Sequence, residues 1–316
     1  MAVNKFGRIG VLMGGPSAER KISLKSGKAV YEALRQLGLE VSAIDIKTEN
    51  IRENIRLLKA QRIDCAFLAL HGRFGEDGSM QGILDSLKIP YTGSGKSASR
   101  LAMDKVASRR ILKAHGLTVP RYKVMERSSS SRNACAELSG IGFSFPLVVK
   151  PAQQGSSIGL SIVDKKEKLK AALAAAFRFD ERVLIEEYIA GREVTVGILH
   201  NRALPVIEIV PKKRFFDYEA KYTAGLTDYI VPAKLEEKIA GKIKAAALSA
   251  HRLLGCSGCS RVDMILSRDN LVYVLEVNTI PGFTSTSLVP KAAKAIGIEF
   301  GQLCLKLIKS AYNGKA

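Results

Sequence analysis

Apolar and polar residues alternate along the first seventy positions with two periods, one typical of strands and the other of helices. Apolar runs at 8–13, 41–45 and 65–70 predict buried strands, and apolar residues at helical spacing predict helices at 23–37 and 51–60. Strands that alternate with helices form a parallel sheet with helices on both faces. We therefore expect an α/β domain at the N-terminus.

A second region begins with a helix that the pattern predicts at 98–115. Strands are expected after it at 146–150, 160–163 and 183–188, and an Ala-rich helix is expected at 166–177. A short run of serines precedes the first of these strands, and we find no repeat elsewhere in the chain.

A third region begins near Gly191, with strands predicted at 194–199 and 205–209 and a long helix at 235–254. A strand hairpin and one last helix complete the chain. Residues 211–232 lack periodicity and are rich in Lys, Tyr and Asp. A long irregular segment in a compact enzyme is usually a functional lid or disordered.

The hairpin of the third region carries the most informative polar residues. Arg261-Val262-Asp263 precedes an alternating apolar stretch, and Glu276-Val277-Asn278 ends it, with a turn expected at Asp269-Asn270. In a symmetric register Asp263 lies opposite Glu276, and Arg261 lies opposite Asn278. Alternation then places these four polar side chains on one face. The other face is expected to hold Val262, Met264, Leu266, Tyr273, Leu275 and Val277.

Opposed carboxylates repel each other unless a cation lies between them. Asp263, Glu276 and the Asn278 amide supply oxygen only, which suits Mg²⁺ rather than Zn²⁺. Arg261 beside them would face an anion shared with the metal, such as a phosphate. A solvated hairpin edge with ordinary charges is the alternative that the hairpin alone leaves open, and a three-residue turn would shift the register.

Length and composition indicate a globular protein of several domains. At 316 residues the chain is too long for one compact core, and 47% hydrophobic with 25% charged residues is ordinary. We expect domains at 1–97, 98–190 and 191–316. No apolar run approaches the roughly 18 residues that span a bilayer. The first apolar run is short and contains Gly10, so it predicts a strand rather than a signal peptide, and a cytoplasmic location follows.

Charge and cysteines narrow the chemistry further. Five scattered cysteines argue against a disulfide framework, and the lone C-x-x-C of Cys256 and Cys259 favours packing over metal binding. The net charge of +19 permits nucleic-acid binding. The basic residues are spread along the chain without a basic tail or helix, so anionic substrates are the simpler explanation.

Three glycine-rich segments are candidate ligand loops. In LVVKPAQQGSSIGLS (147–161) a strand ends in Lys150, and a Gly/Ser turn offers N–H groups and hydroxyls to phosphates. In GGPSAERKIS (14–23) Glu19 could hold an ammonium, and in HGRFGEDGSMQG (71–82) His71 and its neighbours mark a crevice at a strand end. The alternative for 147–161 is a plain hairpin turn. For Glu19 it is a glutamate favoured at a helix start, and for His71 it is a structural histidine.

Further candidates depend on their context. Lys105 is on a helix in a basic run, where a surface lysine is the plainer interpretation. Glu186 and Glu193 flank a strand end and could reach donors on a nucleoside, although such acids are usually solvated. In PGFTSTSL, Gly282 permits close backbone approach, and Ser287 could cap a helix whose N-terminus accepts a carboxylate.

Taken in order, these segments resemble one family. GGPSAERKIS, HGRFGEDGSMQG, KPAQQGSSIG, EEYIAGRE, DYEAKY, SRVD and EVNTIPGFTSTSLVP make the chain similar to the D-alanine–D-alanine ligases over essentially its whole length. The resemblance implies a Rossmann-like parallel-sheet domain followed by a two-part ATP-grasp fold. It also implies ATP-dependent joining of two D-alanines through an acyl phosphate, for peptidoglycan precursors.

The resemblance also implies roles for individual residues. For ATP and Mg²⁺ (two ions, with Mn²⁺ as a substitute) these are Lys105, Lys150, Ser157, Glu186, Ile189, Glu193 and Lys221, with Asp263, Glu276 and Asn278 on the metal. For the D-alanines and the reaction they are Glu19, His71, Ser156, Tyr222, Arg261, Gly282, Ser287 and Leu288. Arg261 and the Gly282 N–H are expected to stabilise the oxyanion, and Ser156 and Tyr222 to link with Glu19 and fasten the lid.

Partners and rivals complete the prediction. The resemblance implies small-molecule substrates and a homodimer through the N-terminal domain, with no nucleic acid and no membrane insertion. Related ligases that join D-alanine to D-lactate or D-serine are the nearest rivals, and Lys221-Tyr222 favours D-alanine. A non-catalytic, basic nucleotide- or nucleic-acid-binding protein is the rival of another class. Phe216, where the family often has tyrosine, and the charge of +19 depart from the family pattern.

Overall fold

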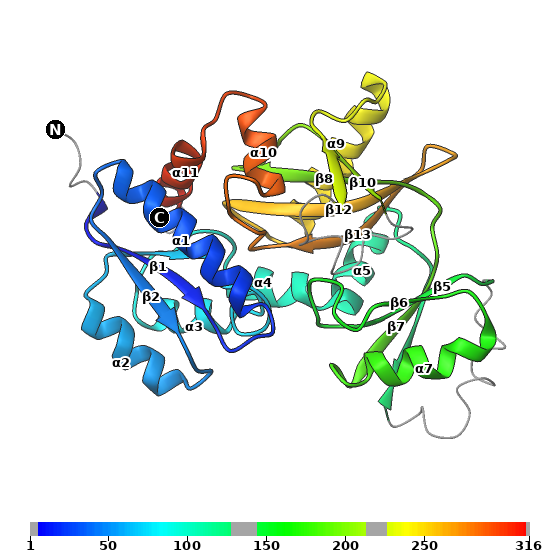
Figure 1. Ribbon diagram of the computed structural model, residues 1–316, viewed down its shortest axis with the longest axis horizontal. Helices are drawn as coiled ribbons and strands as arrows, with labels where there is room; N and C mark the ends of the chain where they lie inside the picture. The colour runs from blue at the N-terminus through cyan, green and yellow to red at the C-terminus, as the bar shows by residue number, and fades with distance from the viewer. Residues whose placement is uncertain (1–5, 128–143, 213–225, 314–316) are drawn as a thin grey trace.

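The computed structural model describes residues 6–127, 144–212 and 226–313, which form three sheets covered by helices (Figure 1). The first sheet is parallel, with strand order β2-β1-β3. Its elements are β1 (Ile9–Gly14), α1 (Arg20–Gln36), β2 (Val41–Ile46), α2 (Ile51–Gln61), β3 (Cys65–Leu68) and α3 (Ser79–Ser86). Alternation sends Val11 into the core with Leu34 of α1, and Leu12 into the core with Leu58 of α2. The predicted α/β arrangement is confirmed.

The second sheet is antiparallel, with strand order β4-β7-β5-β6. Its elements are β4 (Tyr122–Glu126), β5 (Leu147–Pro151), β6 (Ser161–Val163), α7 (Lys166–Ala176) and β7 (Arg182–Glu187). The sequence pattern did not predict β4. On β7, Val183 and Ile185 pack in the core beneath α7, whereas Leu184 and the side chain of Glu186 take the opposite face. That face is turned toward the rest of the molecule.

The third sheet has six strands, in the order β11-β10-β8-β12-β13 with β9 added beside β8. Its elements and the helices after it are β8 (Gly191–Leu199), β9 (Arg202–Ala203), β10 (Ile207–Pro211), β11 (Thr227–Ile230), α9 (Glu237–Leu253), β12 (Cys259–Ser267), β13 (Val272–Asn278), α10 (Leu288–Lys294) and α11 (Phe300–Asn313). Ile243 and Ala247 of α9 cover the face that carries Val196 and Val262. The opposite face carries the polar residues Arg261 and Asp263, while its end at Leu199 and Cys259 packs in the core shared with the first sheet.

Two sequence predictions about this region are wrong. The stretch 211–232 is not irregular throughout, because 227–230 forms strand β11, which pairs antiparallel with β10. The single last helix is two helices, α10 and α11. α11 packs against α1 and β3, so this helix lies beside the first sheet (Figure 1). The proposed division at 97/98 and 190/191 stays a prediction.

The hairpin of β12 and β13 has the predicted register at its polar end. Arg261 pairs with Asn278, and Asp263 pairs with Glu276. A bulge follows, because Met264 pairs with Val274 and leaves Leu275 as an extra residue. The bulge reverses the expected alternation, so that Leu275 lines the opposite face with the polar residues, and the core contains Val274 but not Tyr273. The prediction for these two side chains is therefore wrong.

The helix predicted at 98–115 is also wrong, since it is broken at Asp104 into α4 (Lys96–Met103) and α5 (Lys105–Ala114). Asp104 has extended backbone, and its Oδ1 accepts hydrogen bonds from the amides of Val106 and Ala107, both at 3.0 Å. A short acidic side chain competes with the helix for backbone donors and so begins a new helix. Oδ2 accepts from Arg182 Nη2 at 2.6 Å, which ties α5 to β7.

Replacing Asp104 by Ala is expected to destabilise the protein by about 2 kcal/mol at neutral pH, because a helix cap and an ion pair are both lost. Burial by itself raises the pKa of the Asp104 carboxyl, but the bonds from Ala107 and Arg182 outweigh it and lower the pKa. A carboxyl whose pKa is lower in the folded protein than in the unfolded chain adds to the free energy of unfolding above its unfolded-state pKa. This contribution is lost as the pH falls through its folded-state pKa.

Urea unfolding of both proteins between pH 3 and pH 7 tests this expectation. The difference in unfolding free energy between wild type and Asp104→Ala should be full at pH 7 and shrink below about pH 4. Asp164→Ala is the control, since its partner Lys168 is exposed, and it should leave the midpoint unchanged. Equal midpoints for Asp104→Ala and wild type at pH 7 would show that the cap is energetically irrelevant.

Candidate functional site

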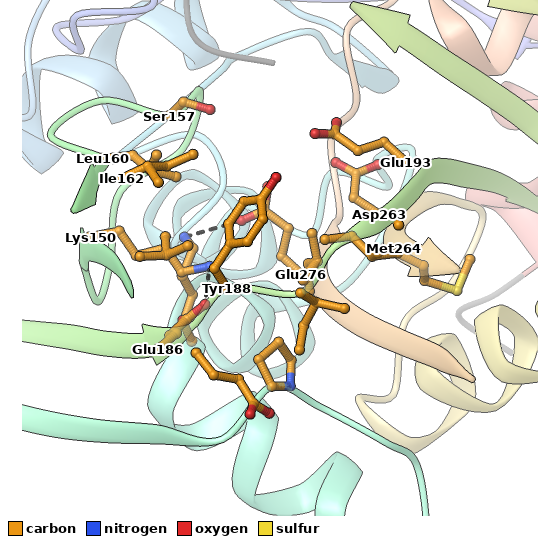
Figure 2. A pocket seen from close by; sticks show the side chains of 18 of the residues that line it. Lys150, Ser157, Leu160, Ile162, Glu186, Tyr188, Glu193, Asp263, Met264 and Glu276 are labelled. Carbon is orange, nitrogen blue, oxygen red and sulfur yellow. Dashed lines mark ion pairs between the residues drawn. The ribbon is translucent and has the colours of Figure 1, made fainter. Parts of the chain in front are cut away.

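A cavity of about 340 Å³ lies between the second and third sheets, with α5 behind it (Figure 2). Eight of the residues singled out in the sequence line it: Lys105, Lys150, Ser157, Glu186, Ile189, Glu193, Asp263 and Glu276. Figure 2 shows Lys150 and Glu186 from the second sheet on one side, and Glu193 and Asp263 from the third sheet on the other. Apolar side chains such as Leu160, Ile162 and Met264 complete the wall. A cavity that combines apolar walls with charged side chains from both sheets suits a ligand that has an apolar part and a charged part.

Lys150 is the next-to-last residue of β5 and is buried. Its Nζ lies 3.1 Å from Oε2 of Glu186, which is itself buried and lies 2.6 Å through Oε1 from Nη1 of Arg109. Burial lowers the pKa of Lys150 to about 8, the Glu186 carboxylate opposes that shift, and the Arg109 charge adds to it. The Glu186 carboxylate is therefore held by two cations, and in this structure it serves to position Lys150.

Asp263 is the centre of the polar face of the hairpin. Arg261 donates to both of its oxygens, from Nε to Oδ1 at 2.8 Å and from Nη2 to Oδ2 at 2.7 Å. The Asn278 amide donates to Oδ2 at 3.0 Å, and the Thr195 hydroxyl donates to Oδ1 at 2.7 Å. The polar group that the sequence predicted is thus brought together, with Thr195 added from β8. In this structure the Arg261 guanidinium is paired with the Asp263 carboxylate.

Glu276 is opposite Asp263 and is bound by a different cation. Its Oε2 lies 3.4 Å from Nζ of Lys105, which also donates to the carbonyl of Gln154 at 2.5 Å. Two carboxylates and an amide on adjacent strands offer only oxygen donors, which fits Mg²⁺. Within the described parts of the chain, no group of three or more His, Cys, Asp or Glu side chains is arranged to hold a metal ion, and this site itself has two carboxylates and an amide.

A second group of candidates lies around Glu19, at the start of α1. Glu19 is buried, and the Ser156 hydroxyl from the Gly/Ser loop donates to its Oε1. A Cβ on Gly72 would lie 2.7 Å from Oε2 of Glu19, and one on Gly155 would lie 3.2 Å from it. Gly72 also has a φ of +75°. Glycine is therefore required at 72 both by its backbone conformation and by the space that the carboxylate occupies.

His71 connects this group to the loop after β13. Its Nδ1 lies 3.0 Å from the carbonyl of Ile280, which assigns the ring proton to Nδ1 and leaves Nε2 to accept from the Ser26 hydroxyl at 3.0 Å. The Ser26 oxygen in turn accepts from the Phe283 amide at 3.2 Å. The carboxyl of Glu76 lies 3.4 Å from Nδ1 of His71. Burial raises the pKa of Glu76, the negative charge of Glu19 raises it further, and the hydrogen bond with His71 lowers it. Acidic and imidazole groups thus lie together beneath the loop.

Gly282, Ser287 and Leu288 lie in or just after that loop. Ser287 is at the N-cap position of α10, but its side chain makes no capping bond, so the prediction of a side-chain cap is wrong. Its oxygen instead accepts from the Thr284 amide at 3.0 Å, and a Cβ on Gly282 would lie 3.6 Å from it. The Ser287 hydroxyl bonds within the loop, so it does not cap the first amides of α10.

The two groups of candidates meet at a smaller cavity. It is lined by Lys105, Glu276 and Asn278 from the first group and by Glu76 and Gly155 from the loops around Glu19. The structure therefore brings the predicted nucleotide and metal residues close to the loops around Glu19, whereas Ser287 and Leu288 line neither cavity. Lys221, Tyr222 and Phe216 lie outside the described residues. Sequence reasoning missed Arg109, Thr195 and Glu76. Glu76 could have been found from its place in the same glycine-rich segment as His71.

Comparison with known proteins gives a consistent result. Family models described as the D-ala D-ala ligase C-terminus and N-terminus match residues 111–309 and 47–94. A D-alanine–D-alanine ligase of Geotalea uraniireducens is 48% identical over 307 residues, which cover 97% of this chain and 96% of that protein. One of Syntrophotalea carbinolica is 48% identical over 304 residues, 96% of each chain.

Solved structures agree with these relatives. A Bacillus anthracis D-alanine–D-alanine ligase complexed with ATP is 36% identical with a TM-score of 0.84, covering 97% of this chain and 98% of that chain. The VanG D-Ala:D-Ser ligase of Enterococcus faecalis is 33% identical with a TM-score of 0.82, covering 96% and 99%. Along the described part of this chain, no helix is long and apolar enough to cross a membrane.

Proposed function

Because the chain belongs to the D-alanine–D-alanine ligase family, we propose that it joins two D-alanine molecules at the cost of one ATP, for peptidoglycan precursor synthesis. The observation that carries the proposal is the single site in which Lys105, Lys150, Asp263 and Glu276 converge beside the buried Glu19. The ATP complex of the Bacillus anthracis relative supports the nucleotide as ligand of the larger cavity.

In the proposed reaction, the carboxylate of the first D-alanine attacks the γ-phosphorus of ATP, and the bond to the β-phosphate oxygen breaks to leave ADP and an acyl phosphate. The amine of the second D-alanine then attacks the acyl carbon. The tetrahedral intermediate expels phosphate, the amine proton is lost, and the dipeptide remains. Phosphoryl transfer depends mainly on alignment and charge neutralisation. Lys105 and Lys150 would provide part of that neutralisation from the cavity wall.

We assign the residues by the two halves of the site. Lys105, Lys150, Ser157, Glu186, Ile189, Glu193 and Lys221 hold the nucleotide. Glu19, His71, Ser287 and Leu288 hold the D-alanines, with Ser156 and Tyr222 fastening Glu19 to the lid. Arg261, whose two bonds to Asp263 use only two of its five N–H groups, and the Gly282 N–H stabilise the oxyanion.

Asp263, Glu276 and Asn278 fit Mg²⁺, for which Mn²⁺ could substitute, and we propose that they hold two ions. The ions supply charge neutralisation for the transferred phosphoryl group. We further propose a cytoplasmic homodimer that associates through residues 1–97, with further domains at 98–190 and 191–316. Light scattering at several protein concentrations tests the dimer, and a monomer mass at all of them would refute it.

The apparent affinity for ATP is expected to fall as the pH rises through about 8. Lys150 has a pKa of about 8, so it carries its charge below that pH and loses it above. The pH dependence of kcat/KM for ATP reports ionisations of the free enzyme. It should show an alkaline limb near pH 8 in the wild type, and Lys150→Met, which has no charge to lose, should lack that limb. A limb of the same position in both would assign it to another group.

The activity itself is tested by phosphate release from the purified protein with ATP and Mg²⁺, with D-alanine or L-alanine. Release that requires D-alanine, with dipeptide formed, is expected. D-serine and D-lactate as second substrates test the nearest rivals, and faster formation of their products would reassign the acceptor. No turnover with any D-amino acid, together with salt-sensitive DNA binding, would favour the non-catalytic rival.

A further inference from the structure

Arg109, on α5, has no role in the proposed reaction, yet it is the largest fully buried side chain among the described residues. It is absent from the lining of the nucleotide cavity and lies behind its wall. A guanidinium is not deprotonated in proteins, so a full charge is kept out of water here. Such a charge is retained only where its partners compensate for it.

The partners of Arg109 come from two different sheets. Nη1 and Nη2 lie 2.6 Å and 3.2 Å from the two oxygens of Glu186, on β7 of the second sheet. Nη2 also donates to the carbonyl of Leu275, on β13 of the third sheet, at 3.1 Å. Glu186 and Leu275 both line the cavity. One planar side chain thus fixes two walls of the cavity relative to each other.

Neighbouring contacts hold the guanidinium in this geometry. Its Cζ lies 5.6 Å from the ring centre of Tyr122, which pairs with Glu186 across β4 and β7. Leu275 is the residue displaced by the β-bulge, so its carbonyl is not in the regular ladder with β12. Lys150 lies 3.1 Å from Oε2 of Glu186, the same oxygen that Arg109 Nη2 contacts. Arg109 therefore shares the carboxylate with Lys150.

We propose that Arg109 is a positioning residue of the nucleotide site: by binding Glu186 and the Leu275 carbonyl together, it sets the spacing of the two sheets and holds Lys150 toward the cavity. The inference rests on the proposed function only in taking the ligand to be an adenine nucleotide. Without Arg109, Glu186 has Lys150 as its remaining cation, and the lysine is drawn toward the carboxylate and away from a phosphate. Lysine at 109 has no planar guanidinium with which to contact both Glu186 oxygens and the Leu275 carbonyl.

The test is ADP binding by calorimetry in buffer with MgCl₂, for wild type, Arg109→Lys and Arg110→Lys. Arg110 is the next residue of α5 and is exposed, so it is the matched control. Loss of one charge-assisted bond corresponds to about a tenfold change in affinity, so Arg109→Lys should weaken ADP binding by about that factor. KM for ATP should rise in parallel while KM for D-alanine stays within about twofold, and Arg110→Lys should match wild type. ADP affinity of wild-type strength in folded Arg109→Lys would overturn the inference.

A second comparison covers the case in which Arg109→Lys does not fold. In the double variant Arg109→Met/Glu186→Gln both buried charges are removed, so neither is left unpaired. Because Arg109 also holds Leu275, the double variant should bind ADP more weakly than Glu186→Gln alone. Equal ADP affinity in these two would overturn the bridging role. A wild-type chain that does not bind ADP would instead overturn the nucleotide assignment, and this inference with it.

Discussion

Glu276→Gln is expected to lower kcat by at least about 10²-fold while the protein stays folded, since loss of a single electrostatic group from a reaction centre commonly costs that much. The substitution keeps the size of the side chain and removes its charge. Glu276 lies opposite Asp263 in the hairpin register, and its Oε2 is 3.4 Å from Nζ of Lys105. An amide in its place weakens the proposed metal site and leaves Lys105 without that carboxylate.

Initial rates measured against Mg²⁺ concentration separate the weakened metal site from the loss of the carboxylate beside Lys105. If Glu276 binds the metal, the variant should need a higher Mg²⁺ concentration for half-maximal rate and should stay slow at saturation. Its urea midpoint should match wild type, because the side chain is only partly buried. Glu181→Gln, at an exposed carboxylate paired with Arg127, is the control for loss of a negative charge. An unchanged kcat at saturating Mg²⁺ in Glu276→Gln would refute the metal assignment.

The polar face of the hairpin could be predicted from the sequence because strand periodicity is strict. With a period of two, a polar residue at every second position of both strands fixes a common face, and Arg261, Asp263, Glu276 and Asn278 are found on one. The same argument failed at Leu275, five residues after Asn270, where the bulge reverses the alternation. A bulge adds a residue without changing the composition of the strand, so periodicity alone does not reveal it.

The helix break at Asp104 and the role of Arg109 were missed for a related reason. Asp104 lies in a run whose apolar spacing continues through it, and its capping function depends on whether its side chain faces its own backbone. Arg109 has a sequence neighbour of the same type, Arg110, and nothing in the sequence distinguishes the buried arginine from the exposed one. The difference arises only when Glu186, 77 residues away, is brought against α5.

The glycine-rich segments were predicted as ligand loops, but their mutual contacts depend on the fold. Glu19, His71 and Ser156 belong to three separate segments, and the structure places Ser156 on Glu19 and links His71 through Ser26 to the loop at Phe283. The net charge of +19 comes from basic residues that are spread along the whole sequence. Of these, Lys105 and Lys150 lie in the site, and both are buried. Most of the excess charge thus lies outside the proposed chemistry.

Glu19→Gln is expected to reduce kcat/KM for D-alanine by roughly 10²- to 10³-fold, because an ion pair between a buried carboxylate and a substrate ammonium corresponds to about 3–4 kcal/mol. Glu19 is buried, and the absence of a Cβ on Gly72 leaves the space that its Oε2 occupies. That space is retained in the variant. The loss would therefore come from charge rather than from a changed shape.

Three measurements distinguish this result from general damage. ADP affinity should be unchanged, since Glu19 is outside the larger cavity. The thermal midpoint should stay the same or rise, because a neutral amide costs less to bury than a carboxylate. Glu32→Gln, at an exposed position of the same helix α1, should behave as wild type in every assay. A Glu19→Gln protein that keeps its kcat/KM for D-alanine would move the ammonium site to another acid, and the buried Glu76 beside His71 would be the next to replace, because it lines the smaller cavity that joins the two halves of the site.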